Sequence, residues 1–179
     1  MNLMERAKNI ILKPRTEWEV IKVETLSASE MFNQYAKFMA ALPAIGGFLA
    51  LGLSGVSVAR ALLWALLEYF LTLAGVYAFA YVMSALASLS RAKKDMISSL
   101  KIAIFASSPA WLGGIFNFIP ELSILSLIAG LYSLYLLYLG IKILKEPPSD
   151  NLLSYFFVTF VVGIVIYILV GRLAGAFAV

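Results

Sequence analysis

Glu68 is the residue whose type and position most directly suggest chemistry. It lies within "WALLEYFLTL", residues 64–73, where nearly every other side chain is apolar. A carboxylate at the centre of a membrane-spanning helix costs on the order of 2.5 to 3.5 kcal/mol, so it must be protonated, paired or near an edge. Thr72, one turn later, could donate a hydrogen bond to it, and Arg172 could pair with it. Glu68 therefore either holds helices together or lines a polar path.

A proline within an apolar segment is the second unusual feature. In "IFASSPAWLGG", residues 104–114, Pro109 removes one backbone donor and leaves the carbonyl of Phe105 without its helical partner. We expect a kink here, with Ser107 and Ser108 bonding to the freed polar groups. The kink either serves packing alone or opens a small polar cavity or hinge.

Tyrosines and small residues mark further helix faces. Tyr132, Tyr135 and Tyr138 recur every three residues in "LYSLYLLYLG", and buried tyrosine hydroxyls need partners, so we expect some of them to face other helices. Small residues recur at a spacing of four in two segments: Ala106, Ala110 and Gly114 in one, and Gly171 and Gly175 in the other. Such faces allow close helix approach, and the second could mark a contact between two copies of the chain.

The residue inventory excludes much catalytic and metal chemistry. The chain has no histidine and no cysteine, which removes thiol nucleophiles, thiolate or imidazole metal sites and the usual general base near pH 7. No nucleotide-binding loop, serine triad or catalytic acid pair is visible. We therefore predict no catalytic, cofactor-binding or metal-binding residues, and no enzymatic activity.

Composition identifies the class of protein. Of 179 residues, 62% are hydrophobic and only 13% are charged, whereas a soluble domain has about 25% charged residues. The apolar residues occur in stretches of about twenty, the length that an α-helix needs to cross a bilayer. The fold class predicted is an all-α, polytopic helical membrane protein. Its net charge of +4 comes from scattered basic residues, which do not form a nucleic-acid-binding patch.

Five membrane-spanning helices can be placed, preceded by an amino-terminal segment. We predict a membrane domain over residues 35–179 and a cytoplasmic segment over 1–34. The predicted spans are about 35–53, 61–83, 96–118, 122–144 and 152–173. Ser27 and Glu30 have the spacing of a helix-starting capping box just before the first span.

The positions of lysine and arginine predict the orientation, because basic residues near spans are retained in the cytoplasm. With the amino terminus inside and the carboxyl terminus outside, the five spans separate these residues twelve to two. Only Arg60 and Arg172 fall on the outer side. Lys93 and Lys145 are among those predicted to face the cytoplasm.

The amino-terminal segment contains a short amphipathic stretch, "TEWEVIKVE". Thr16 and Glu19 have capping-box spacing, and Trp18 and Ile21 share one face among charged residues. We predict a short helix on the cytoplasmic membrane surface, with Trp18 at headgroup level and Ile21 beside it. The alternative is a loosely ordered tail, since the stretch is short.

Three segments together resemble the Yip family of small five-span membrane proteins. They are "LKPRTEWEVIKVE" before the first span, "KIAIFASSPAWLGGIF" in the third and "LYSLYLLYLGIKILKEPP" in the fourth. The resemblance implies a cytoplasmic amino terminus, five spans and a role in membrane traffic or organisation through protein partners. Eukaryotic members of that family interact with Rab-type GTPases.

Two stretches depart from the eukaryotic pattern. The sequence reads "EMFNQYAKF" where eukaryotic members tend to have an Asp-Leu-Tyr-Gly-Pro-like motif, and Ile104-Phe105 where they tend to have Gly-Tyr. Their amino-terminal region also tends to be longer. We therefore expect a short prokaryotic member in the cell membrane, which contacts lipids and an unidentified membrane or cytoplasmic protein. The alternative is a small channel or transporter with a polar path around Glu68 and the Pro109 kink.

Overall fold

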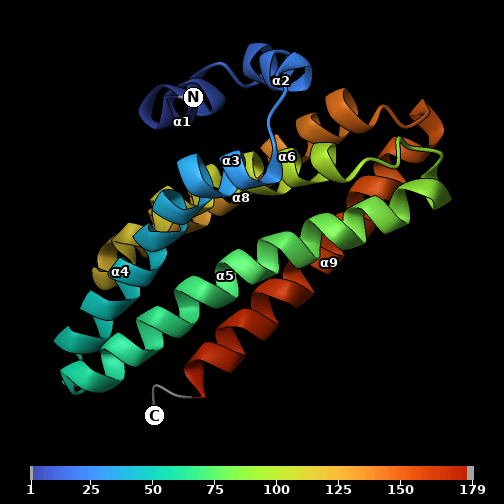
Figure 1. The fold of residues 1–179 in the computed structure, drawn as a ribbon. Helices are drawn as coiled ribbons and strands as arrows, with labels where there is room; N and C mark the ends of the chain where they lie inside the picture. The colour runs from blue at the N-terminus through green and yellow to red at the C-terminus, as the bar shows by residue number, and fades with distance from the viewer. Residues whose placement is uncertain (1, 177–179) are drawn as a thin grey trace.

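The computed structural model describes residues 2–176 and is all-helical over them (Figure 1). Five helical segments are long and apolar enough to cross a membrane: residues 28–53, 58–90, 96–118, 123–145 and 149–175. The predicted fold class and number of spans are confirmed. The end of the predicted membrane domain, residues 177–179, lies outside the described part.

Helix α1 (Leu3–Leu12) is an element that the sequence analysis did not anticipate. It begins because the side chain of Asn2 accepts hydrogen bonds from the backbone N–H groups of Met4 and Glu5, at 3.1 and 3.4 Å. Ala7 and Ile10 lie one turn apart on its buried face.

Helix α2 (Pro14–Val23) contains the predicted amphipathic stretch but begins two residues before Thr16. Pro14 occupies the first helical turn, where its missing N–H would have had no partner anyway and its fixed φ suits a helix. Our prediction that Thr16 starts the helix is therefore wrong. The alternative of a loosely ordered tail is also wrong, since α1 and α2 form a helical pair that we call the cap.

The first two spans follow the cap through a short extended linker, residues 24–27. The capping box of Ser27 and Glu30 is confirmed and starts α3 (Ala28–Met31), which continues through a π-helical turn (Phe32–Ala36) into α4 (Lys37–Leu53). The second span consists of α5 (Val58–Leu86) and a 3-10 turn (Ala87–Ser90).

The third span is interrupted at Ser107, as the position of Pro109 predicts. Helix α6 (Met96–Ala106) ends there and α7 (Ser108–Gly114) begins, followed by a 3-10 turn (Ile115–Phe118). We call the junction at Ser107 the break.

The last two spans complete the bundle after a further 3-10 turn (Pro120–Leu122). Helix α8 (Ser123–Gly140) ends in a π-helical turn (Ile141–Lys145), and α9 (Ser149–Gly175) is continuous. Figure 1 shows α9 running beside α5, while α4, α6 and α8 form the group beneath the cap.

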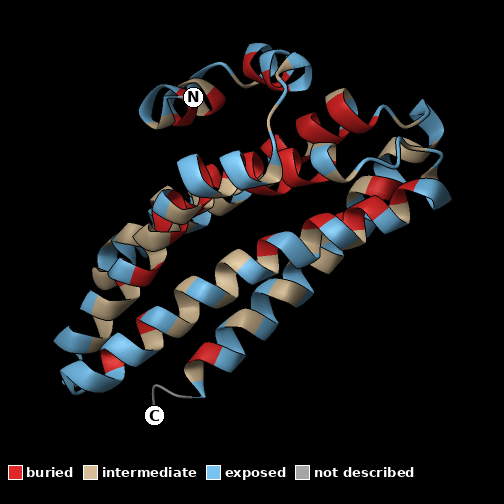
Figure 2. Ribbon diagram, in the orientation of Figure 1, coloured by how far each residue is buried: buried red, intermediate tan, exposed pale blue. Residues whose placement is uncertain are grey.

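Burial is concentrated in the half of the molecule that carries the cap (Figure 2). The most apolar part of the third span is 72% buried inside the chain, whereas that of the fifth is 11% buried. The third span is thus the central helix of the bundle. Helix α9 instead exposes a long apolar surface, which suits contact with lipid.

The cap lies along the flanks of the third and fourth spans, not only over their ends. The carbonyl of Ile11 accepts a hydrogen bond of 2.7 Å from Tyr132. Tyr132 is thirteen residues before Lys145, the last residue of the fourth span, which is about 20 Å along a helix. The Trp18 ring lies over Gly140, where an added Cβ would be 2.9 Å from the indole.

This packing corrects our prediction for Trp18 and Ile21. Both residues are 0% exposed and belong to the hydrophobic core, so their side chains do not face lipid headgroups. The indole packs directly over Gly140, which has no side chain to displace it. Burying an aromatic side chain there is favourable by roughly 1.5–3 kcal/mol.

Replacing Gly140 with alanine should therefore loosen the cap. The new methyl group would displace the Trp18 ring, at a cost of roughly 1–3 kcal/mol for overpacking, and raise hydrogen exchange over residues 3–23. Gly130→Ala is the matched control, because no atom lies within 4 Å of a Cβ placed there. Equal exchange in the two variants would show that Trp18 does not hold the cap in place.

Candidate functional site at the cap

A buried arginine joins the two cap helices. Arg6 is on the inner face of α1, 7% exposed, and its guanidinium donates to Glu17 of α2 at 2.5 Å and to Glu24 of the linker. Removing one partner from a buried pair of this kind costs about 3–5 kcal/mol, since the other charge stays buried. The pairing therefore fixes α1, α2 and the linker relative to one another.

The same arginine contacts the third span just before the break. Its Cζ lies 5.6 Å from the centre of the Phe105 ring, a cation–π distance. Phe105 in turn packs edge-on against Tyr35 of the first span, with ring centres 5.0 Å apart.

The polar groups freed at the break are bonded as the sequence predicts. Ser107 donates to the carbonyl of Ala103 and Ser108 donates to that of Phe105, both at 2.8 Å. Because the Ser108 hydroxyl has only one hydrogen, Tyr35 must be the donor in the 2.7 Å bond that joins the two hydroxyls. The break is therefore a locally satisfied polar cluster within the bundle.

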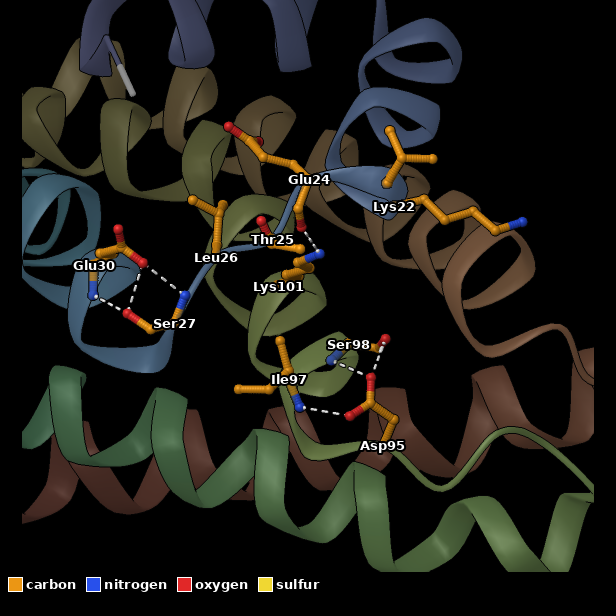
Figure 3. Close-up of a pocket in the computed structure, with 11 residues that line it drawn as sticks. Lys22, Glu24, Thr25, Leu26, Ser27, Glu30, Asp95, Ile97, Ser98 and Lys101 are labelled. Carbon is orange, nitrogen blue, oxygen red and sulfur yellow. Dashed lines mark hydrogen bonds between the residues drawn. The ribbon is translucent and has the colours of Figure 1, made fainter.

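Lys101 of α6 holds the end of the cap (Figure 3). Its ammonium donates to the carbonyls of Ile21 at 2.7 Å and Glu24 at 2.6 Å, two acceptors at the carboxyl end of α2. A cation favours this end of a helix dipole. In Figure 3 the Glu24 carbonyl faces Lys101, while its carboxylate points to the other side.

A groove of about 530 Å³ lies beside this contact, between the linker and the start of α6. Its charged groups are already engaged. Glu30 accepts from the Ser27 hydroxyl at 2.7 Å, and Asp95 accepts from the Ser98 backbone at 2.9 Å. The groove therefore separates the linker from α6 without presenting an unpaired charge.

Two residues at the end of the fourth span attach neighbouring loops. The buried Lys145 donates to the carbonyls of Lys93 and Asp95, at 3.1 and 2.7 Å. Glu146 accepts from Lys22 at 2.5 Å and from Lys93, and these bonds lower the pKa of Glu146 to about 2. The pairs are thus formed at neutral pH, and their contribution is lost only as the pH falls from about 4.5 towards 2.

Glu68 lies apart from the cap, within α5. Thr72 donates to its Oε1 at 3.4 Å, the contact that the spacing suggests, and its Oε2 is buried without a hydrogen-bond partner. Arg172 is exposed on α9, and within residues 2–176 the structure contains no ion pair between it and Glu68. The structure thus gives Glu68 a weak local bond and no counter-charge.

The predicted tyrosine ladder divides between two surroundings. Tyr132 bonds to the cap and its ring lies 5.6 Å from that of Tyr135, which is 38% exposed. Tyr138 packs edge-on against Phe156 of α9. Two of the three therefore face other helices, as their need for partners suggests.

The residues that attach the cap were not predicted from the sequence. In the sequence, Glu17 was interpreted as part of a charged surface helix, and Arg6, Lys101 and Lys145 were interpreted as signals of orientation. A detectable sign was the place of Lys101 five residues into an apolar span, where an ionisable group needs a partner. Its partners are backbone carbonyls, which sequence patterns do not reveal.

The described residues include no cluster of three or more acidic, histidine or cysteine side chains that could hold a metal ion. What the site offers is a pair of short helices, held on the bundle by buried charges, with one face turned outward.

Comparison with known proteins places this architecture in a family. The Yip1 domain matches residues 8–172, from the middle of α1 to near the end of the fifth span. No curated protein and no solved structure matches the chain. Proteins of the matched family are generally non-enzymatic membrane proteins. The resemblance seen in the sequence is thus confirmed, and the chain is an integral membrane protein that belongs to the Yip1 domain family.

Proposed function

We propose that the chain is a non-enzymatic membrane protein that recruits a cytoplasmic protein through the outward face of the cap, and so organises its membrane. The supporting observation is that the docked cap exposes large apolar side chains. Met4 is 75% and Val23 78% exposed, and Leu12 and Val20 are exposed as well. On a segment this rich in charge, such residues favour a docking surface.

The surroundings of these side chains fit a protein interface. Lys8 on α1, Lys13 between the two helices and Arg15 on α2 are also exposed. Apolar contacts with a charged rim are the usual arrangement of protein–protein interfaces. A surface that lies on anionic lipid would use the same residues, so the experiment below separates the two partners.

We further propose that the cap is cytoplasmic, that the carboxyl terminus is outside and that the membrane is a prokaryotic cell membrane. The arrangement of elements supports the orientation. The cap, the start of α6 and the end of the fourth span, which carry most basic residues, lie towards one end, whereas Arg60 and Arg172 lie near the start of α5 and the end of α9.

Cysteine labelling tests this orientation in a chain without native cysteines. An impermeant thiol reagent applied to intact cells should label a cysteine at Ala176 and spare one at Lys93, which should react only after permeabilisation. Both positions are exposed, whereas Lys145 is buried and unsuitable. Labelling of position 93 in intact cells would reverse the orientation.

Photo-crosslinking in cells tests the docking surface directly. A photoreactive amino acid at Val23 should give discrete protein adducts, because this side chain points outward from the cap. The matched control is Leu127, an equally apolar and 59% exposed residue of the fourth span, which should give lipid adducts. Lipid adducts alone from position 23 would contradict protein recruitment and favour a membrane-surface role.

The second candidate, a small channel or transporter, is favoured by one observation: the buried Oε2 of Glu68 has no partner. Unpaired ionisable groups within membranes often mark ion or proton pathways. Against it, Ser107 and Ser108 have their bonds within the break, so they present no free hydroxyl hydrogen to such a path.

Glu68→Gln distinguishes these functions. If Glu68 is a neutral helix contact, the variant should keep its melting temperature within a few degrees, because glutamine retains the acceptor for Thr72 and no ion pair is lost. Proton and cation flux in proteoliposomes should be at background for both proteins. A stable variant that abolishes a wild-type flux would establish transport, and Thr72→Val controls for loss of the weak local bond.

A second copy of the chain is a further proposed partner within the membrane. Gly171 and Gly175 lie on α9, and an added Cβ at either would meet no atom within 4 Å. Small residues on an open helix face permit close approach of another helix.

A further inference from the structure

We infer that the cap is a releasable lid on the third and fourth spans, and that its docking through Arg6 holds the break at Ser107 in its observed geometry. Release of the cap and rearrangement of the break would then be one event. The inference concerns the chain alone and does not depend on any partner that the cap recruits.

The cap is too short to persist as helices away from the bundle. Helices α1 and α2 have ten residues each, below the roughly 12–15 residues at which isolated helices become marginally stable in water. The bundle also supplies hydrogen-bond donors to the carbonyls at their carboxyl ends, from Tyr132 to Ile11 and from Lys101 to Ile21. Undocking would remove these bonds, so the cap should unfold as it leaves.

The docked cap also leaves some polar groups without hydrogen-bond partners, which lowers the free-energy cost of release. Two donors on the inner face of the cap, Nε of Arg6 and Nε1 of Trp18, are buried without a hydrogen-bond partner within the described chain. Each such group regains a partner in water. Residues 24–27 form no helix, and the carbonyl of Glu24 joins this linker to α6 by accepting from Lys101.

The contact between cap and break runs through two aromatic rings. Arg6 lies over Phe105, and Phe105 packs against Tyr35, which donates to Ser108. Ser108 donates to the carbonyl of Phe105, the acceptor that Pro109 leaves free in the helix. Arg6 of the cap therefore contacts the ring of Phe105, and the carbonyl of Phe105 accepts the hydrogen bond that completes the polar cluster at the break.

Through these contacts, the geometry of the break depends on whether the cap is docked. With Arg6 docked, the fully buried Phe105 ring lies between the guanidinium and the ring of Tyr35, whose hydroxyl is at hydrogen-bonding distance from Ser108. Without the Arg6 guanidinium, Phe105 loses its cation–π contact, and we expect its packing against Tyr35 to shift. If the cap served only as a rigid lid, its release would leave the break unchanged.

Hydrogen exchange of the full chain in lipid nanodiscs tests the inference with Arg6→Met, which keeps much of the side-chain volume and removes the charge. We expect at least about tenfold faster exchange over residues 3–23, together with faster exchange over 104–110. Arg15→Met is the matched control, because Arg15 is exposed on the same cap, and it should change neither region. A released cap with an unchanged break would overturn the coupling, and an unchanged cap would overturn release through Arg6.

Tyr35→Phe approaches the same contact from the opposite end and leaves every charge in place. Loss of the hydroxyl should speed exchange over residues 104–110 and, through Phe105, speed cap exchange by several-fold. In the double variant Arg6→Met with Tyr35→Phe, cap exchange should rise by less than the product of the single effects, because coupled sites are not additive. A rise equal to that product would refute the coupling, even if Arg6→Met alone folds poorly.

Discussion

The need to satisfy buried cations is the constraint on which the cap half of this molecule depends. Arg6, Lys101 and Lys145 are all at least nine-tenths buried. A buried charge is tolerated only with paired charges or several hydrogen bonds. Arg6 takes its partners from α2 and the linker, whereas the two lysines bond to backbone carbonyls at the ends of other elements. Each cation thus joins segments that are distant in sequence, and together they fix the cap, the loops and the third span.

This constraint explains why the most central span is also the one that carries a buried charge. The third span faces lipid on few sides, because α4, α5, α8 and the cap surround it. Lys101 can therefore lie within it without meeting hydrocarbon, as its ammonium ends under the carbonyls of α2. By contrast, α9 packs mainly along α5 and carries an almost wholly apolar outer face. The two halves of the molecule are thus suited to different surroundings.

Sequence patterns predicted the parts of this structure that depend on local chemistry. Span lengths follow from apolar runs, the break follows from Pro109, and the start of α3 follows from Ser27 and Glu30. The position of the cap could not be predicted in this way, because it depends on long-range contacts such as Trp18 on Gly140 and Lys101 on carbonyls of α2. An amphipathic helix of ten residues has the same pattern whether its apolar face meets lipid or protein.

The division between the halves bears on where specificity resides. An apolar outer face such as that of α9 is matched by any lipid tail, since hydrocarbon makes no directional demand. The cap instead presents apolar side chains among charges, at positions fixed by the pairing of Arg6 with Glu17. A partner that binds there must match both shape and charge, and a prepositioned surface lowers the ordering cost of binding. Buried charges that contribute little net stability can therefore be retained because they hold the proposed recognition surface in one arrangement.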